Sequence, residues 1–190
     1  MKYFTADPHI DHAKVLVGER GRCFPTIEQW STHFLSEINR VVRRQDTLYI
    51  LGDFAFKRPD LWRAKIKCGN VWLIVGNHDP SPAQLDAAFG KGKARLTYET
   101  HVLDQPCFLS HYAHAFWPKS HRGSIHLYGH NHGQREETLD DWMPQRRSMD
   151  VCPEMAHRLL GEWRPFSEVE IHSRLMQRTG HDELEFYEGR

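Results

Sequence analysis

Polar side chains that can hold metal ions or move protons follow apolar runs at five places in the chain. The runs end in Asp7-Pro8-His9, Gly52-Asp53, Gly76-Asn77-His78-Asp79, Ser110-His111 and Gly129-His130-Asn131-His132. In α/β sheets, ligands bind where strands end, because the loops there bring side chains together in one crevice. These endings supply carboxylates, an amide and imidazoles, which are the mixed oxygen and nitrogen ligands that divalent ions accept. The pattern predicts a metal site at the strand ends.

The spacing of these residues favours a site for two ions. Two divalent ions about 3.5–4 Å apart stabilise phosphoryl transfer and need a bridging group, for which Asp53 is the candidate. On an extended backbone residues i and i+2 point the same way, so Asp7 and His9 are expected to reach one site. The later His-x-His has the same spacing. Glycine precedes Asp53, Asn77 and His130, and is expected to allow a sharp turn and the approach of substrate to the backbone.

In chain order, the motifs Asp-x-His, Gly-Asp, Gly-Asn-His-Asp, His and Gly-His-x-His resemble those of the calcineurin-like metallophosphoesterase family. The resemblance covers roughly residues 2 to 151. It implies a dinuclear, metal-dependent phosphoesterase that hydrolyses P–O bonds. In such an enzyme a water or hydroxide between the two ions attacks phosphorus, because the cations lower its pKa.

The roles of that family carry over to the matching positions of this chain. The resemblance implies that Asp53 bridges two divalent ions, with Mn as the first choice and Fe, Zn or Ni as alternatives. It implies that His78 protonates or stabilises the leaving oxygen and that Asp79 orients the His78 imidazole. The other implied ligands are Asp7, His9 and His132 for one ion and Asn77, His111 and His130 for the other.

The chain departs from the protein-phosphatase branch of that family. That branch has Asp-Arg-Gly soon after Gly-Asp and ends its third motif in Glu, whereas here Phe-Ala-Phe-Lys-Arg follows Asp53 and the third motif ends in Asp79. Short prokaryotic or phage-type phosphoesterases are more similar. We expect a small phosphodiester or nucleotide substrate. A metal-dependent nuclease acting on DNA or RNA and a non-catalytic metal-binding scaffold are the alternatives.

Three further side chains are candidates for substrate contact. His12 follows the Asp-x-His pair, where it could meet a substrate oxygen or cap a helix. His114 and Trp117 belong to the aromatic segment Tyr112-Ala-His-Ala-Phe-Trp117. This segment could stack on a base or ring of the substrate, or it could be a loop held by its own aromatic side chains.

Apolar periodicity and capping signals predict the elements that must position these residues. Strands are expected at residues 2–6, 47–51, 71–75, 95–102, 107–110, 125–128 and 147–151, and helices at 27–44, 59–67, 82–89 and 169–178. Thr26–Gln29 and Ser167–Glu170 have the form of capping boxes. Strands alternating with helices, followed by a strand-rich half, predict an α/β fold with helices outside. The family resemblance implies a four-layer α/β/β/α sandwich of two mixed sheets flanked by helices.

Composition limits the class of protein. The 190 residues are expected to form one domain, residues 1–190, with a C-terminal helix and charged tail at 165–190. Lys plus Arg and Asp plus Glu are each 25, and this balance argues against a tight nonspecific nucleic-acid binder. The sequence still leaves a nucleic-acid partner possible. The 14 histidines are an excess that metal or acid-base chemistry would explain.

The sequence also gives expectations about location and partners. No apolar run approaches the roughly 18 residues that would suggest a membrane span, so no membrane partner is expected. The four cysteines are far apart and form no Cys-x-x-Cys pair, which is typical of reduced cysteines in a cytoplasmic protein. Exposed apolar helix surface would support a homodimer.

Overall fold

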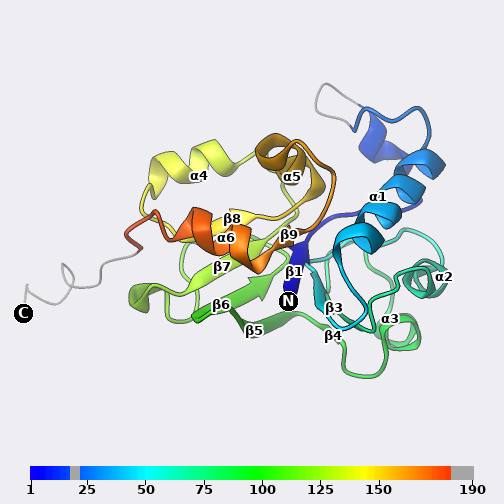
Figure 1. Ribbon diagram of the computed structural model, residues 1–190, viewed down its shortest axis with the longest axis horizontal. Helices are drawn as coiled ribbons and strands as arrows, with labels where there is room; N and C mark the ends of the chain where they lie inside the picture. Colours follow the sequence, from blue (N-terminus) through cyan, green and yellow to red (C-terminus); the bar gives the residue numbers. More distant parts are fainter. Residues whose placement is uncertain (18–21, 181–190) are drawn as a thin grey trace, which may run out of the picture.

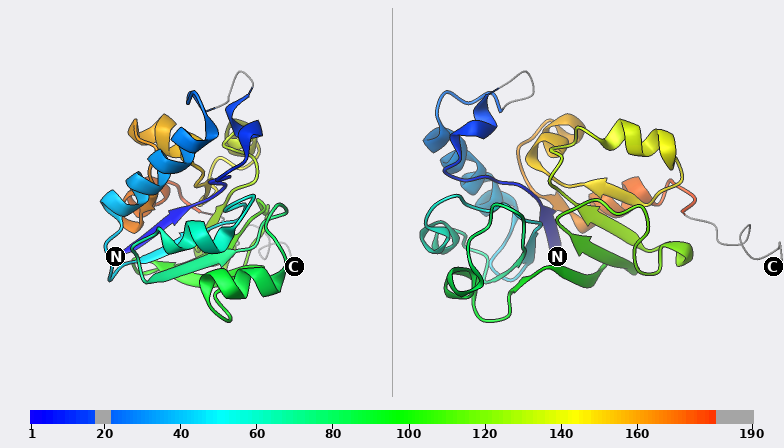
Figure 2. Two further views of the ribbon diagram at one scale, coloured as in Figure 1. Left: turned by 90° about the vertical axis from the view of Figure 1, so that its right-hand side faces the viewer. Right: turned by 180° about the vertical axis from the view of Figure 1, so that it is seen from behind.

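Two mixed β-sheets form the centre of the molecule and are flanked by helices (Figures 1 and 2). The computed structural model describes residues 1–17 and 22–180, so the charged tail expected after Gly180 lies outside the described residues. The predicted α/β sandwich of two mixed sheets is confirmed.

The first sheet has five strands, and four of them are parallel. Its order is β4 (Ala94–Arg95), β3 (Asn70–Ile74), β2 (Thr47–Ile50), β1 (Lys2–Thr5) and β9 (Phe166–Ser167). Only the β1–β9 pair is antiparallel. The carboxyl ends of β1, β2 and β3 therefore meet at one edge of the sheet, and the polar motifs predicted to bind metal follow these strands directly.

The second sheet has four strands in sequence order. They are β5 (Thr97–Val102), β6 (Gln105–Ser110), β7 (Ile125–Tyr128) and β8 (Ser148–Asp150). β5 and β6 are antiparallel, whereas β6, β7 and β8 are parallel. This arrangement brings the ends of β6 and β7 together, where the remaining histidine motifs begin.

Helices α1 (Ile27–Val41), α2 (Pro59–Ala64) and α3 (Pro82–Phe89) lie beside the first sheet (Figure 1). Helices α4 (Glu136–Trp142), α5 (Pro153–Leu160) and α6 (Glu168–Leu175) lie on the side of the second sheet. Two short 3-10 turns span Ala13–Leu16 and Ser120–Arg122. The Ser167–Glu170 capping box is complete, and the Thr26 hydroxyl accepts a hydrogen bond from the Gln29 backbone N–H.

Several predicted bounds differ from the structure. The expected helix at 27–44 ends at Val41 and the one at 59–67 ends at Ala64. The expected strand at 95–102 is two strands, because the chain passes from the first sheet to the second at Leu96. Helices α4 and α5 and strand β9 were not predicted.

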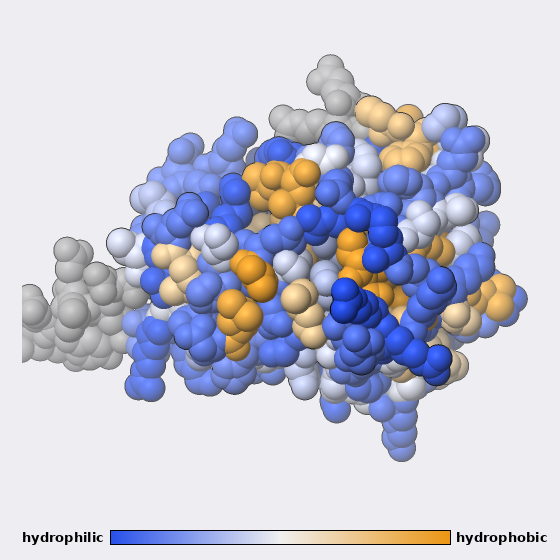
Figure 3. Space-filling view, viewed as in Figure 1, coloured by the Kyte–Doolittle hydropathy of each residue, from blue (hydrophilic) through white to orange (hydrophobic). Residues whose placement is uncertain are grey.

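Two apolar clusters hold the layers together. One joins α1 to the first sheet through side chains such as Trp30, Phe34 and Leu48. The other joins the two sheets, and includes Phe4 and Leu127. On the face shown in Figure 3, apolar side chains form small separate groups among hydrophilic ones. Within residues 1–17 and 22–180, no helix is long and apolar enough to cross a lipid bilayer.

Candidate metal centre

The parallel strands of both sheets end in one region, where the residues predicted to bind metal come together. Asp7, Asp53 and Asn77 follow the adjacent parallel strands β1, β2 and β3. His111 and His130 follow β6 and β7 in the other sheet. Two groups of side chains could each hold a metal ion, with ligand atoms within 4.8 Å of one another: Asp7, His9 and His132, and Asp7, Asp53 and His111.

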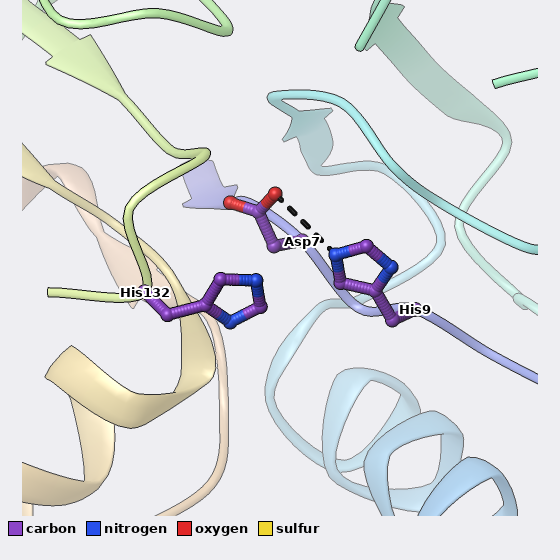
Figure 4. Close-up of side chains that lie close together, drawn as sticks. All are labelled: Asp7, His9 and His132. Carbon is purple, nitrogen blue, oxygen red and sulfur yellow. Dashed lines mark ion pairs between the residues drawn. The ribbon is translucent and has the colours of Figure 1, made fainter. Parts of the chain in front are cut away.

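Asp7 belongs to both groups. Its side chain is fully buried, its Oδ2 accepts a hydrogen bond from the His130 backbone N–H at 2.7 Å, and its Oδ1 has no hydrogen-bond partner within residues 1–17 and 22–180. Figure 4 shows this carboxylate close to the rings of His9 and His132, which stack with centroids 5.1 Å apart. A buried carboxylate oxygen without a donor is costly, and a bound cation would satisfy it.

The first group presents ring nitrogens to the space beside Asp7. Burial, assisted by the neighbouring His132, lowers the pKa of His9 to about 2, so the ring is neutral and carries one N–H. Nδ1 of His9 lies 3.1 Å from Nδ1 of His12. If that contact uses the proton, the Nε2 lone pair faces Asp7 Oδ1 at 3.8 Å and Asp53 Oδ2 at 3.5 Å. Lone pairs facing carboxylate oxygens repel unless a cation lies among them.

The charge of the cluster leads to the same conclusion. Burial raises the pKa of Asp7 well above its ordinary value; the nearby His132 lowers it, while the carboxylates of Asp150 and Asp53 raise it further. A divalent cation reverses this balance, because it favours ionised carboxylates and neutral imidazoles. The donor set of oxygen and nitrogen atoms therefore fits a hard or borderline divalent ion.

Asn77 and His130 lie next to the second group, and His111 and His130 both contact the Asn77 side chain. Oδ1 of Asn77 lies 2.9 Å from Nε2 of His111 and 3.0 Å from Nδ1 of His130. Nδ1 of His111 donates to the Leu51 carbonyl at 2.9 Å, so Nε2 is the ring nitrogen that faces Asn77. The Asn77 oxygen and the two imidazole nitrogens thus meet at one place, and they are donor types that a divalent cation accepts.

Asp53 belongs to the second group and also lies close to His9 of the first. Its Oδ2 is 3.5 Å from Nε2 of His9 and 3.7 Å from Nε2 of His111, and its Oδ1 accepts a hydrogen bond from the His78 backbone N–H at 2.9 Å. This position suits the bridging role predicted for Asp53. Asp7 is also placed between the groups, since its Oδ1 is 4.0 Å from Nδ1 of His111.

Backbone strain is concentrated in this region. Five of the seven candidate ligands have a positive φ, a conformation that non-glycine residues rarely adopt. They are Asp7, His9, Asp53, His130 and His132, with φ between 48° and 70°. Asp7 and His9 reach one ligand group, as expected, but the extended backbone given as the reason is wrong for both i, i+2 pairs. The left-handed turns direct the side chains inward, and strain of this kind gathers at functional sites.

The glycines before three of the ligands leave room for other ligands. A Cβ added to Gly52 would lie 2.2 Å from the His111 ring, and one added to Gly129 would lie 2.2 Å from the Asp7 carboxylate. A Cβ added to Gly76 would lie 2.2 Å from the Asp53 carboxylate. These glycines were expected to let substrate approach the backbone. The structure shows instead that each lets a side chain of the cluster approach.

His78 and Asp79 have different surroundings. The exposed His78 ring lies 5.7 Å from the rings of His9 and His12, measured between centroids. The Asp79 carboxylate accepts three backbone hydrogen bonds, from Asp53, Phe54 and Gly76, at 2.8–2.9 Å. These contacts tie the Asp53 loop to the Asn77 loop, and the expected orienting of the His78 imidazole by Asp79 stays a prediction.

Of the three side chains predicted to touch substrate, one lies beside the candidate ligands and two pack on His126. His12 adjoins the cluster through His9 and His78. Exposed His114 donates its backbone N–H to Nε2 of His126 and packs on that ring. Trp117 is 5% exposed, packs on His126 and donates its Nε1–H to the Ser124 carbonyl. The structure thus gives Trp117 packing contacts, and substrate contacts of His114 and Trp117 stay predictions.

Two residues that hydrogen-bond to the candidate ligands or to their backbone were not predicted from the sequence. Glu154, at the start of α5, accepts a hydrogen bond from Nδ1 of His132 at 2.9 Å, which leaves Nε2 for the metal group. Arg22 is 1% exposed and donates to Glu154 and to the carbonyls of Asp7 and Pro8. Neither residue belongs to a motif, so no local signal in the sequence could have revealed them.

Asp150 is a third residue that was not predicted from the sequence and that holds part of the site in place. It is fully buried at the end of β8, and its carboxylate accepts hydrogen bonds from the backbone N–H groups of Gly133 and Cys152. Burial raises its pKa to about 6 despite these bonds. Asp150 therefore fixes the loop that carries His130 and His132.

Comparison with known proteins supports the fold and leaves the function to be argued from the site. No family model matches the chain. An uncharacterized protein of Methanocaldococcus jannaschii is 25% identical over 157 residues, which are 80% of this chain and 81% of that protein. The crystal structure of a protein of unknown function from Aquifex aeolicus superposes with a TM-score of 0.70 at 22% identity, over 92% of this chain and 98% of that one. This second likeness shows a shared fold.

A phosphoesterase from E. coli, Yfce, is a more distant neighbour. Its TM-score is 0.42 at 17% identity, over 80% of this chain and 78% of that chain. A likeness this weak carries no argument about function, which must come from the site itself.

Proposed function

We propose that this chain is a dinuclear, metal-dependent phosphoesterase of the calcineurin-like class. The observation that carries the proposal is the pair of ligand groups that share the buried Asp7, whose Oδ1 has no hydrogen-bond partner in the part of the chain that the structure describes. Two divalent ions there would polarise a phosphate ester and lower the pKa of water between them. Mn is the proposed metal, and Fe, Zn and Ni fit the same donors.

The residues of the chain supply the geometry for this chemistry. Asp53 would be shared between the ions, with Asp7, His9 and His132 on one side and Asn77, His111 and His130 on the other. Glu154 fixes which nitrogen of His132 faces the centre, because it accepts the Nδ1 proton. Asp79 clamps the backbone of the Asp53 loop, which keeps the bridging carboxylate in place.

His78 is the proposed general acid. Its backbone is fixed by the hydrogen bond to Asp53 Oδ1, while its ring is exposed beside His9 and His12. A ring held by its main chain at the edge of the cluster can give a proton to a leaving oxygen that points outward. Acid catalysis of this type contributes about 10²- to 10⁴-fold.

The proposed substrate is a small phosphodiester or nucleotide. The net charge is zero, so the chain as a whole has no excess of basic residues to neutralise a polynucleotide. A nuclease would need a basic groove beside the metal centre, and a scaffold would bind metal without turnover. The proposal also includes a homodimer through exposed apolar helix residues such as Leu61 and Val169, which light scattering of the purified protein tests.

The test is hydrolysis of bis-p-nitrophenyl phosphate beside p-nitrophenyl phosphate, with added Mn²⁺ and with EDTA. We expect metal-dependent hydrolysis that favours the diester and is abolished in Asp53→Ala. Preference for the monoester would redirect the substrate to phosphate monoesters. Cleavage of plasmid DNA, abolished by the same substitution, would favour the nuclease. Metal binding without hydrolysis of any of these would favour the scaffold.

A further inference from the structure

Two exposed aromatic side chains adjoin the metal cluster, one beside each group of ligands. Phe56 is 53% exposed and Tyr112 is 49% exposed. Each ring leaves about half of its surface exposed beside the candidate ligands, and an aromatic face in this position can stack on a planar group of a bound ligand.

Phe56 is linked to the first group through two histidines. Its ring stacks on His12 with centroids 4.6 Å apart and planes 7° apart, and His12 contacts His9. The backbone N–H of Phe56 donates to the Ile10 carbonyl at 2.9 Å, beside the bridge between Ile10 and Ala55. Phe56 is therefore held by main-chain contacts next to the Asp-x-His segment, while more than half of its surface remains exposed.

Tyr112 is linked to the second group in the same way. Its ring packs edge-on against His130 at 4.6 Å and His111 at 4.9 Å. Its hydroxyl donates to Asn77 Oδ1 at 3.4 Å, and its carbonyl accepts from the Ser110 hydroxyl at 2.5 Å. Side chain and main chain thus both fix the ring at the edge of the cluster.

We propose that Phe56 and Tyr112 each provide a stacking surface for the planar ring of a nucleoside phosphodiester whose phosphate is held at the metal centre. The inference rests on the proposed function and names its substrate class. Rings held in place lose little freedom on binding, and stacking on an aromatic side chain stabilises a bound base. Because each ligand group has its own ring, a nucleoside on either ester oxygen of the phosphate would find an aromatic surface.

The test compares two diesters that differ only in the ring-bearing substituent, thymidine 5′-(p-nitrophenyl phosphate) and methyl p-nitrophenyl phosphate, with the Mn²⁺-loaded protein. The leaving group is the same, so the ratio of their kcat/KM values measures recognition of the nucleoside. We expect the wild type to prefer the thymidine ester, and Phe56→Ala or Tyr112→Ala to lower the ratio roughly 5- to 100-fold, the loss of one stacked base.

Two control variants separate stacking from other effects. Tyr112→Phe keeps the ring and removes the hydroxyl, so it should retain the preference. Trp142→Ala removes a 76% exposed aromatic side chain on α4 and should leave the ratio unchanged. No preference in the wild type, or an equal loss for both esters in Phe56→Ala and Tyr112→Ala, would overturn the inference.

A binding measurement keeps the inference testable if turnover fails. Calorimetry with thymidine 5′-monophosphate and with methyl phosphate gives the preference for the nucleoside without hydrolysis. A preference that falls in Phe56→Ala and Tyr112→Ala supports the stacking site even when neither diester is cleaved, in which case only the proposed reaction has failed. Equal Kd values for the two ligands would overturn the stacking site.

Discussion

Gly76 and Asp53 touch so closely that no side chain fits between them. A Cβ on Gly76 would lie 2.2 Å from Oδ1 of Asp53 and 2.7 Å from its backbone nitrogen. The Gly76 N–H also donates to Asp79, whose carboxylate holds the Asp53 backbone. The close approach therefore places the end of β3 against the carboxylate proposed to bridge the two ions.

Gly76→Ala is predicted to reduce metal binding strongly, because the new methyl group must displace Asp53. The matched control is Gly69→Ala, where the added Cβ would meet only the Arg44 carbonyl at an ordinary 3.7 Å. Mn²⁺ bound per chain, measured after equilibrium dialysis, should fall in the first variant and not in the second. Full metal content in Gly76→Ala would show that the contact is not needed for the site.

His78→Ala is predicted to keep its metal and lose about 10²-fold or more in turnover, because its ring contributes acid catalysis and no ligand. His101→Ala, which removes an exposed histidine on β5, serves as the control. Steady-state hydrolysis and metal analysis on the same preparations separate the two effects. Equal turnover in His78→Ala and wild type would remove the assigned role.

The His132–Glu154 pair is predicted to make the metal-free protein depend on pH. Burial lowers the pKa of His132, but the hydrogen bond and charge of Glu154, together with Asp7, raise it to about 9. A raised pKa stabilises the folded state fully below the unfolded value of about 6.5, and this contribution is lost as the pH rises through about 9. Denaturant unfolding of EDTA-treated protein between pH 6 and 9.5 should show this decline.

Glu154→Gln removes the charge that raises the His132 pKa. The decline of stability between pH 6.5 and 9 should then become much shallower, whatever the absolute stability of the variant. NMR titration of the His132 ring gives an independent value for its pKa. The same pH dependence in wild type and Glu154→Gln would contradict the proposed coupling.

Arg22→Met is predicted to destabilise the fold, because it removes the buried cation that pairs with Glu154 and that donates to the carbonyls of Asp7 and Pro8. Breaking a buried ion pair costs about 3–5 kcal/mol. The control is Arg58→Ala, whose exposed pair with Asp60 should matter little. Urea unfolding at pH 7 measures both, and an unchanged midpoint in Arg22→Met would show that the Arg22 contacts do not hold the site.

The sequence predicted most strands because each is a short apolar run that ends at a turn. It could not show that the chain changes sheets at Leu96, since periodicity reveals which side chains are buried and not which neighbour a strand pairs with. Helix α5 begins at Pro153 and ends before Gly161, which are ordinary helix boundary signals, but the prediction passed over them.

The candidate ligands were predictable because each directly follows a strand that the apolar pattern reveals. Their backbone conformation was not, since positive φ at Asp7 or His132 depends on the contacts that enforce it. Partners from distant segments were equally hidden. Glu154 meets His132 only because α5 packs beside the loop after β7, and nothing in either segment signals the other.

The central claim is that the strand ends hold two divalent ions shared by Asp53. Equilibrium dialysis of EDTA-treated protein against Mn²⁺, followed by elemental analysis of wild type and Asp53→Ala, tests it most directly. Two ions per chain in the wild type, and clear loss in Asp53→Ala, are predicted. No bound Mn²⁺ in the wild type, or equal binding by both proteins, would contradict it.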